Sequence, residues 1–200
     1  MAVSRLSQLT MHIRGAEAKF TAQQPHGLVE SPYKVNEQPL GTARKIRIIT
    51  IGAGASGLNV VRTLRKQLTN YEHVVYEKNP QVGGTWYENR YPGCKCDIPS
   101  HNYQFSWKPN HEWSSFFSTA EEIEAYLCRL CEDEGMQDQL KTKHEVVGAY
   151  WNETAGRWKV MIKNLGTSIV FEDHCDFLLN ASGILKQVPF PLTSSLFSNS

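Results

Sequence analysis

The chain has 200 residues, of which 40% are hydrophobic and 20% charged, and its formal net charge is +1. This composition is ordinary for one soluble domain that buries a core, and its charge balance argues against nucleic acid or a charged membrane surface as a partner. No apolar run is long enough for a membrane span and the first residues lack a signal-peptide core, so we expect a cytoplasmic protein.

Residues 1–43 show no sustained hydrophobic period, and proline and glycine punctuate their second half. We therefore expect an N-terminal extension that lies on the surface or is partly disordered. The domain itself is expected over residues 44–191, followed by an irregular tail over residues 192–200.

A strand, a glycine-rich turn and a helix are expected at the start of this domain. Residues 46–51 form a short β-branched run, which is typical of a strand buried on both faces of a parallel sheet. Gly52, Gly54 and Gly57 follow at GxGxxG spacing, and apolar residues recur at helical intervals from Leu58. In such a turn, backbone N–H groups and the helix N-terminus can receive a pyrophosphate.

A second apolar run, residues 73–77, ends in Glu77. A carboxylate at the carboxyl end of the neighbouring strand would accept hydrogen bonds from both ribose hydroxyls of a dinucleotide. The alternatives are a glycine turn that binds nothing and a surface glutamate at the end of an unrelated strand. The order of strand, glycines, helix, strand and acid favours a dinucleotide.

Residues 78–118 are rich in glycine, proline, asparagine and aromatic residues and lack a regular period. So many large apolar side chains argue against disorder, and we expect the segment to fold over something flat. Gly83 and Gly84 would let the backbone approach a ligand, with a simple turn as the alternative.

Capping residues at 118–121 and an apolar stripe predict a helix that contains Cys128 and Cys131. The chain has five cysteines and no second CxxC, which favours free thiols and helix packing over a metal site. Residues 145–151 and 157–163 alternate polar and apolar positions and predict a hairpin. Residues 176–181 predict another buried strand, which delivers Ser182 to the same sheet end as the glycine turn.

The run GGTWYENRYPGCKCD, residues 83–97, resembles the flavin-binding segment of class B flavoprotein monooxygenases, particularly the Baeyer–Villiger monooxygenases and their fungal secondary-metabolism relatives. Tyr103 and NASG at residues 180–183 fit the same pattern. The resemblance spans residues 44–191. It implies an α/β fold, with a Rossmann-like parallel sheet, the GxGxxG turn and an inserted antiparallel hairpin, that forms an incomplete FAD/NAD(P)-binding domain.

The resemblance also implies which residues contact cofactors. The expected contacts are Gly52, Gly54, Gly57, Glu77, Gly84, Thr85, Trp86, Tyr87, Glu88, Lys95, Cys96, Asp97, Tyr103 and Val146. The glycine turn would hold the FAD pyrophosphate and Glu77 the adenosine ribose, and Val146 would meet the adenine. Residues 85–88 would line the flavin, and Asp97 and Tyr103 would close the isoalloxazine side. Residues 95–97 resemble the segment that faces the nicotinamide cofactor.

Several of these residues have a simpler structural interpretation. Trp86 and Tyr87 are also compatible with core packing, Asp97 with capping a turn, and Tyr103 with an ordinary buried tyrosine. Lys95 stands where many relatives have arginine, so a planar bidentate contact is lost there. Arg90 fits either a phosphate or a nearby acid and is left unassigned.

The implied function is FAD-dependent oxygenation of a small organic substrate that uses NADPH and O₂, in the Baeyer–Villiger manner and in secondary metabolism. No second GxGxxG occurs among the 14 glycines, so we expect a truncated chain without an NADP-binding domain, and its catalytic residues are unassigned. The alternative is a catalytically inactive flavin-binding remnant or accessory protein. A regulatory NAD-binding module is disfavoured because GGTWY follows the acidic strand. The substrate and the oligomeric state stay open.

Overall fold

The structure of the protein, a computed structural model, describes residues 39, 41–42 and 44–183. Most of the expected extension over residues 1–43 and the whole of the expected tail over residues 192–200 lie outside the described residues. In the described part of the chain, no helix combines the length and the apolar character that crossing a bilayer requires.

A sheet of four parallel strands carries the glycine turn. Its strands are β1 (Ile46–Ile51), β2 (Tyr71–Tyr76), β3 (Leu140–Lys141) and β7 (Phe177–Asn180), in the order β3-β2-β1-β7. The predicted strands β1, β2 and β7 are confirmed, whereas the two-residue strand β3 was not predicted. Ile49 and Val75 are completely buried, as expected for strands covered on both faces.

Two helices cover one face of this sheet. The first, α2 (Ala55–Gln67), starts directly after the glycine turn and buries Leu58 and Val61. The second, α4 (Ala120–Asp133), is the helix predicted from its capping residues, and its apolar stripe packs into the same core cluster as α2. The Thr119 hydroxyl caps α4 by accepting a hydrogen bond from the Glu122 N–H at 3.3 Å. A one-turn helix, α3 (Thr85–Glu88), lies beside α4.

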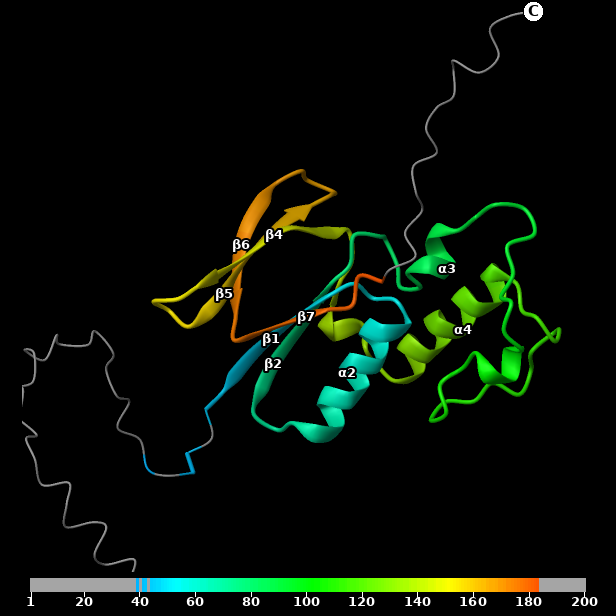
Figure 1. The fold of residues 1–200 in the computed structure, drawn as a ribbon, viewed down its shortest axis with the longest axis horizontal. Helices are drawn as coiled ribbons and strands as arrows, with labels where there is room; N and C mark the ends of the chain where they lie inside the picture. Colours follow the sequence, from blue (N-terminus) through cyan, green and yellow to red (C-terminus); the bar gives the residue numbers. More distant parts are fainter. Residues whose placement is uncertain (1–38, 40, 43, 184–200) are drawn as a thin grey trace, which may run out of the picture. The chain divides into compact units, whose positions relative to one another are not determined.

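A second sheet packs on the opposite face, as Figure 1 shows. It is antiparallel and consists of β4 (His144–Asn152), β5 (Arg157–Asn164) and β6 (Val170–Cys175) in that order. The predicted hairpin is confirmed as β4 and β5, and β6 is a third strand that was not predicted. Because this sheet lies in sequence between β3 and β7, the expected α/β fold with an antiparallel insertion is confirmed.

Asp173 on β6 ties the two sheets together. Its carboxylate accepts two hydrogen bonds from the Arg47 guanidinium, at 3.2 and 2.7 Å, and one from the Tyr76 hydroxyl at 2.7 Å. Burial by itself would raise the pKa of Asp173. The hydrogen bonds from Arg47 and Tyr76 outweigh burial, and the pKa lies below its ordinary value.

The long segment 78–118 is ordered by Tyr126 on α4. The Tyr126 hydroxyl accepts a hydrogen bond from the Phe105 N–H at 3.0 Å and donates one to the Lys108 carbonyl at 2.8 Å.

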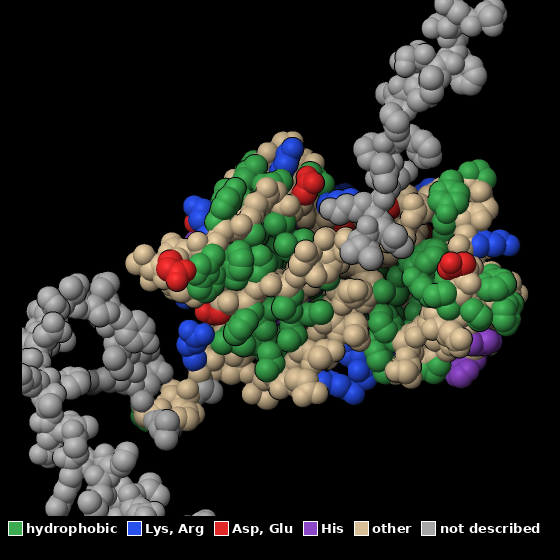
Figure 2. Space-filling model, viewed as in Figure 1, with side chains coloured by type: hydrophobic (Ala, Val, Ile, Leu, Met, Phe, Trp, Pro, Cys, Tyr) green, Lys and Arg blue, Asp and Glu red, His purple; other side chains and the backbone are tan. Residues whose placement is uncertain are grey.

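The aromatic rings of this segment do not all fold over a flat ligand. Phe105, Trp107 and Trp113 pack against the core cluster of α2 and α4. Several other apolar side chains of the segment are exposed, Phe116 by 66%, and Figure 2 shows hydrophobic side chains on the surface around α3 and α4.

We expect Tyr126→Phe to lower the free energy of unfolding by about 1–3 kcal/mol, because the Phe105 N–H loses its acceptor and the Lys108 carbonyl its donor. Urea unfolding of the whole chain measures this loss. Tyr150→Phe is the matched control, since Tyr150 is 61% exposed and the change should cost far less. Equal losses in the two variants would contradict the role assigned to the Tyr126 hydroxyl.

The lowered pKa of Asp173 predicts a pH dependence of stability. A carboxylate with a lowered folded-state pKa stabilises the fold above its unfolded-state pKa, about 4, and this contribution disappears as the pH falls through the folded-state pKa. Asp173→Asn should therefore unfold more easily at neutral pH and show a flatter decline of stability below pH 4, measured by urea unfolding at several pH values. Glu172→Gln, on the same strand, removes an exposed ion pair with Lys159 that solvent screens, so it should flatten the decline much less than Asp173→Asn does.

Candidate functional site

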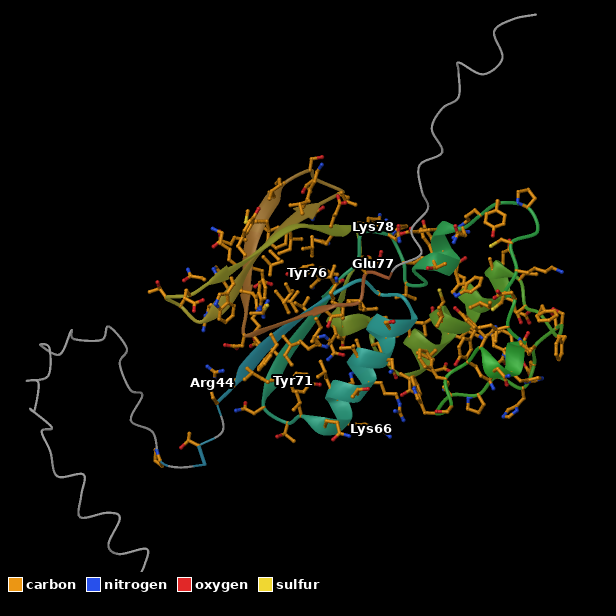
Figure 3. All side chains as sticks on the ribbon, viewed as in Figure 1. Arg44, Lys66, Tyr71, Tyr76, Glu77 and Lys78 are labelled. Atoms are coloured by element: carbon orange, nitrogen blue, oxygen red, sulfur yellow. The ribbon has the colours of Figure 1, made fainter. Side chains whose placement is uncertain are left out.

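A cavity of about 330 Å³ lies at the carboxyl ends of β1, β2 and β7. Its walls are the turn between β1 and α2, the residues that follow β2, helix α3 with Tyr103, the start of β4, and residues 181–183 after β7. Figure 3 shows Glu77 and Lys78 at the end of β2 that is opposite to Tyr71. Ligands of open parallel sheets bind at this end of the strands, and the volume is within the range of small-molecule sites.

The glycine turn leaves no space for side chains at two of its positions. Gly52 has a φ of +96°, and a Cβ on it would lie 2.8 Å from the Ala181 carbonyl oxygen. A Cβ on Gly57 would lie 2.1 Å from the Gly52 carbonyl oxygen. Gly57 therefore does not line the cavity but allows α2 to pack against the turn, while Gly52 and Gly54 line the cavity.

The N-terminus of α2 faces the cavity through Ala55 and Ser56. Its capping residue, Gly54, offers no side chain for the first N–H groups, and the first turn carries no acidic residue. A helix of 13 residues thus presents its positive end and its unpaired backbone donors to the cavity. This arrangement suits an anion such as a diphosphate.

Glu77 is 4% exposed and connects the end of β2 to the glycine turn. Its Oε2 accepts a hydrogen bond from the Ala53 N–H at 2.7 Å, and its Oε1 accepts one from the Asn79 N–H at 2.8 Å. The structure therefore brings the carboxylate and the glycine turn together, as the sequence predicted. Since each carboxylate oxygen can accept two hydrogen bonds, both remain able to accept from ribose hydroxyls.

The opposite wall of the cavity is formed by α3 and Tyr103. Gly84 approaches Gly54 so closely that a Cβ on Gly84 would lie 3.0 Å from the Gly54 Cα. The Trp86 Nε1–H donates a hydrogen bond to the Tyr103 hydroxyl at 3.0 Å, and the two rings meet edge to face with centroids 5.3 Å apart. Burial raises the pKa of Tyr103, so the hydroxyl stays protonated at neutral pH. Thr85 also belongs to this wall.

Residues 95–97 do not line the cavity. Lys95 and Asp97 are exposed, while Cys96 is buried in the core cluster and its N–H donates to the Ser118 carbonyl at 2.9 Å. This segment is held against the start of α4 by a bridge between Lys95 and Thr119. These three predicted residues are therefore not part of the cavity lining, although Cys96 belongs to the core cluster against which Trp86 and Tyr103 pack.

Tyr87 also lies outside the cavity lining, although it belongs to α3. The Arg90 guanidinium lies 4.5 Å from the centre of the Tyr87 ring and forms an ion pair with Glu124 at 2.9 Å. Of the two interpretations of Arg90, the structure supports pairing with an acid.

The cavity also contains residues that were not predicted to contact a cofactor: Ser56, Lys78, His144 and Glu145. Ser56 lies inside the GxGxxG motif and Lys78 follows Glu77, so both could have been found from their neighbours in sequence. His144 and Glu145 precede Val146, which was predicted and does line the cavity. Ser182 and Gly183 also reach the cavity, as expected from the position of their strand.

The cysteines lie apart from this cavity. Cys128 and Cys131 are both on α4, as predicted, and burial raises the pKa of Cys131 to about 11, which keeps its thiol protonated at neutral pH. Among the described residues, no three histidine, cysteine, aspartate or glutamate side chains come together as metal ligands would.

In sequence, this chain is similar to FAD-binding and Baeyer-Villiger monooxygenases. The model of an NAD(P)-binding Rossmann-like domain matches residues 50–120. The FAD-binding monooxygenase moxY of Dothistroma septosporum is 49% identical over 151 residues, which cover 74% of this chain and 24% of the relative. A Baeyer-Villiger monooxygenase of Streptomyces coelicolor is 42% identical over 116 residues, which cover 58% of this chain and 22% of the relative.

Solved structures of monooxygenases also resemble this chain in fold. An oxidized steroid monooxygenase bound to NADP superposes with a TM-score of 0.65 at 30% identity, over 74% of this chain and 28% of that protein. A complex of OTEMO with FAD and NADP superposes with a TM-score of 0.66 at 27% identity, over 76% of this chain and 28% of that protein. The chain thus spans about a quarter of the length of the relatives it matches. Its homologues are FAD-dependent oxidoreductases.

We expect Glu77→Gln to weaken the connection between β2 and the glycine turn. A glutamine has one acceptor oxygen, so either the Ala53 or the Asn79 N–H would face an amide group that cannot accept from it. The free energy of unfolding should fall by about 1–3 kcal/mol, and amide hydrogen exchange should accelerate at residue 53 or 79. Glu72→Gln, at an exposed position of the same strand, is the control. Unchanged exchange at both amides in Glu77→Gln would contradict the assignment.

Proposed function

We propose that this chain, a homologue of FAD-binding and Baeyer-Villiger monooxygenases, binds FAD in the cavity beside its glycine turn. The observation that carries the proposal is that three features meet at one cavity. They are a helix N-terminus without a capping side chain, a glycine turn whose backbone is not covered by side chains, and a buried carboxylate. These are the features that a dinucleotide requires for its diphosphate and its ribose.

The residues of the cavity fit the parts of FAD. The N–H groups at the start of α2, from Ala55 and Ser56, would hold the diphosphate, and Glu77 would hold the adenosine ribose. Trp86 and Tyr103 supply an apolar wall with one protonated hydroxyl for the isoalloxazine end. A Cβ at Gly52 or Gly57 would collide with backbone atoms, so the turn could not be built from other residues.

We further propose that the reaction served by this site is the NADPH- and O₂-dependent oxygenation of a small organic substrate, of the Baeyer–Villiger type and in secondary metabolism. The support is the identity to fungal and bacterial monooxygenases. When bound, FAD supplies the redox chemistry. The residues of this chain bind and orient the dinucleotide, and the hydrogen-bonded Trp86–Tyr103 pair shields part of the cavity from water.

We expect Ser56→Glu to separate dinucleotide binding from stability. A carboxylate near the N-terminus of α2 favours the helix by about 0.3–1 kcal/mol, but it places negative charge where the diphosphate would bind. The affinity for FAD should therefore fall tenfold or more while the midpoint of urea unfolding is unchanged or higher. Ser56→Gln has a similar size and no charge, so it should bind FAD more tightly than Ser56→Glu. Titration of flavin fluorescence anisotropy measures the affinities.

Two outcomes of this experiment would contradict the proposal. If the wild-type chain does not bind FAD, the cavity is not a flavin site. If Ser56→Glu and Ser56→Gln bind FAD equally well, the diphosphate does not lie at the start of α2.

For a chain that binds FAD, addition of NADPH without oxygen tests the enzyme activity. Loss of the yellow flavin absorbance supports an oxygenase, and a flavin that stays oxidised supports an inactive flavin-binding protein.

A further inference from the structure

Glu88 joins two walls of the cavity that are formed by different parts of the chain. Its Oε1 accepts a hydrogen bond from the Lys78 Nζ at 2.8 Å and another from the Asn79 Nδ2 at 3.0 Å. Glu88 belongs to α3, whereas Lys78 and Asn79 follow β2. Both Lys78 and Glu88 line the cavity, so their ion pair connects the wall that contains Glu77 to the wall that contains Trp86.

The surroundings of Lys78 keep it charged and directed toward acids. Its ammonium group interacts with Glu77 and Glu145 in addition to Glu88, and the hydrogen bond to Glu88 is the main reason that the pKa of Lys78 is raised. Three carboxylates around one ammonium leave no excess positive charge at this position. Direct attraction of a diphosphate by Lys78 is therefore opposed by its neighbours.

Residues 77–79 also position Glu77, which is predicted to bind the ribose. Glu77 accepts from the Asn79 N–H, and Asn79 donates its side-chain amide to Glu88. A displacement of α3 away from the residues that follow β2 would therefore break the contacts of Glu88 with Lys78 and Asn79. A dinucleotide that extends from Glu77 to Trp86 would pass between the two walls that this ion pair holds together.

We propose that the Lys78–Glu88 ion pair is a latch that holds the two walls of the cavity together and slows the exchange of the bound dinucleotide. The latch rests on the proposed function, because it acts on the ligand assigned to that site. Lys78 and Glu88 are positioning residues in this proposal. The Lys78 side chain is 48% exposed and that of Glu88 is 19% exposed, so the pair contributes little to folding and can open in solution.

The test measures how fast FAD leaves the full chain. FAD-loaded protein is mixed with a large excess of ADP, which competes for the adenosine half of the site, and the decay of flavin fluorescence anisotropy gives the dissociation rate. Glu88→Gln and Lys78→Met should each release FAD about threefold faster, within the range that a partly exposed ion pair allows. The double variant should release FAD no faster than either single variant, because both changes remove the same interaction.

Three controls distinguish a latch from general loosening of the fold. Lys78→Arg keeps the ion pair and should release FAD as slowly as the wild type does. Glu72→Gln removes ion pairs with Lys45 and Arg47 at the other end of β2 and should leave the rate unchanged. High salt should accelerate release from the wild type toward the rate of the variants, and it should change the variants less.

Equal release rates in the wild type, Glu88→Gln and Lys78→Met would overturn the latch while leaving FAD binding intact. Additive effects in the double variant would also overturn it, since they would show that the two residues do not act through one shared ion pair. Failure of the wild-type chain to bind FAD at all would overturn the proposed function, and the latch with it.

Discussion

The site depends on the hydrogen bond between the Glu77 carboxylate and the Ala53 N–H, which is 2.7 Å long and buried. It connects the end of β2 to the turn that follows β1, and so it fixes the distance between the two elements that a dinucleotide must contact together. A buried carboxylate is costly unless its oxygens are hydrogen-bonded. The Ala53 and Asn79 N–H groups supply these hydrogen bonds, and they hold in place the turn after β1 and the residues after β2.

The remaining walls of the cavity are supported from further away. Asp173 holds the antiparallel sheet on the parallel sheet through Arg47 and Tyr76, and this places the start of β4 beside the end of β2. On the other face, Tyr126 orders the segment that carries Tyr103. The cavity is thus assembled from segments distant in sequence, and each wall relies on a separate polar contact in addition to apolar packing.

The parts predicted from sequence are those whose pattern is local. The strand over residues 46–51, the three glycines, the helix after them and Glu77 lie within one short stretch, and their spacing alone required a strand-to-helix turn beside an acid. Strand β6 was missed because its inward Asp173 looks like a surface residue until its partner Arg47, 126 positions away, is known. The place of residues 95–97 also depends on a distant element, the start of α4. Lys78 and Glu88 are ten residues apart, and only the folded chain shows that they meet.

The most direct test of the account is a titration of the isotope-labelled chain with FAD, followed by the backbone amide resonances in NMR spectra. If the dinucleotide lies across the end of the sheet, the largest shifts will occur at the amides of Gly54, Ala55 and Ser56, with smaller ones around Glu77 and Trp86. If the largest shifts occur instead around residues 95–97, or if no amide of the glycine turn responds to saturating FAD, the central claim is wrong.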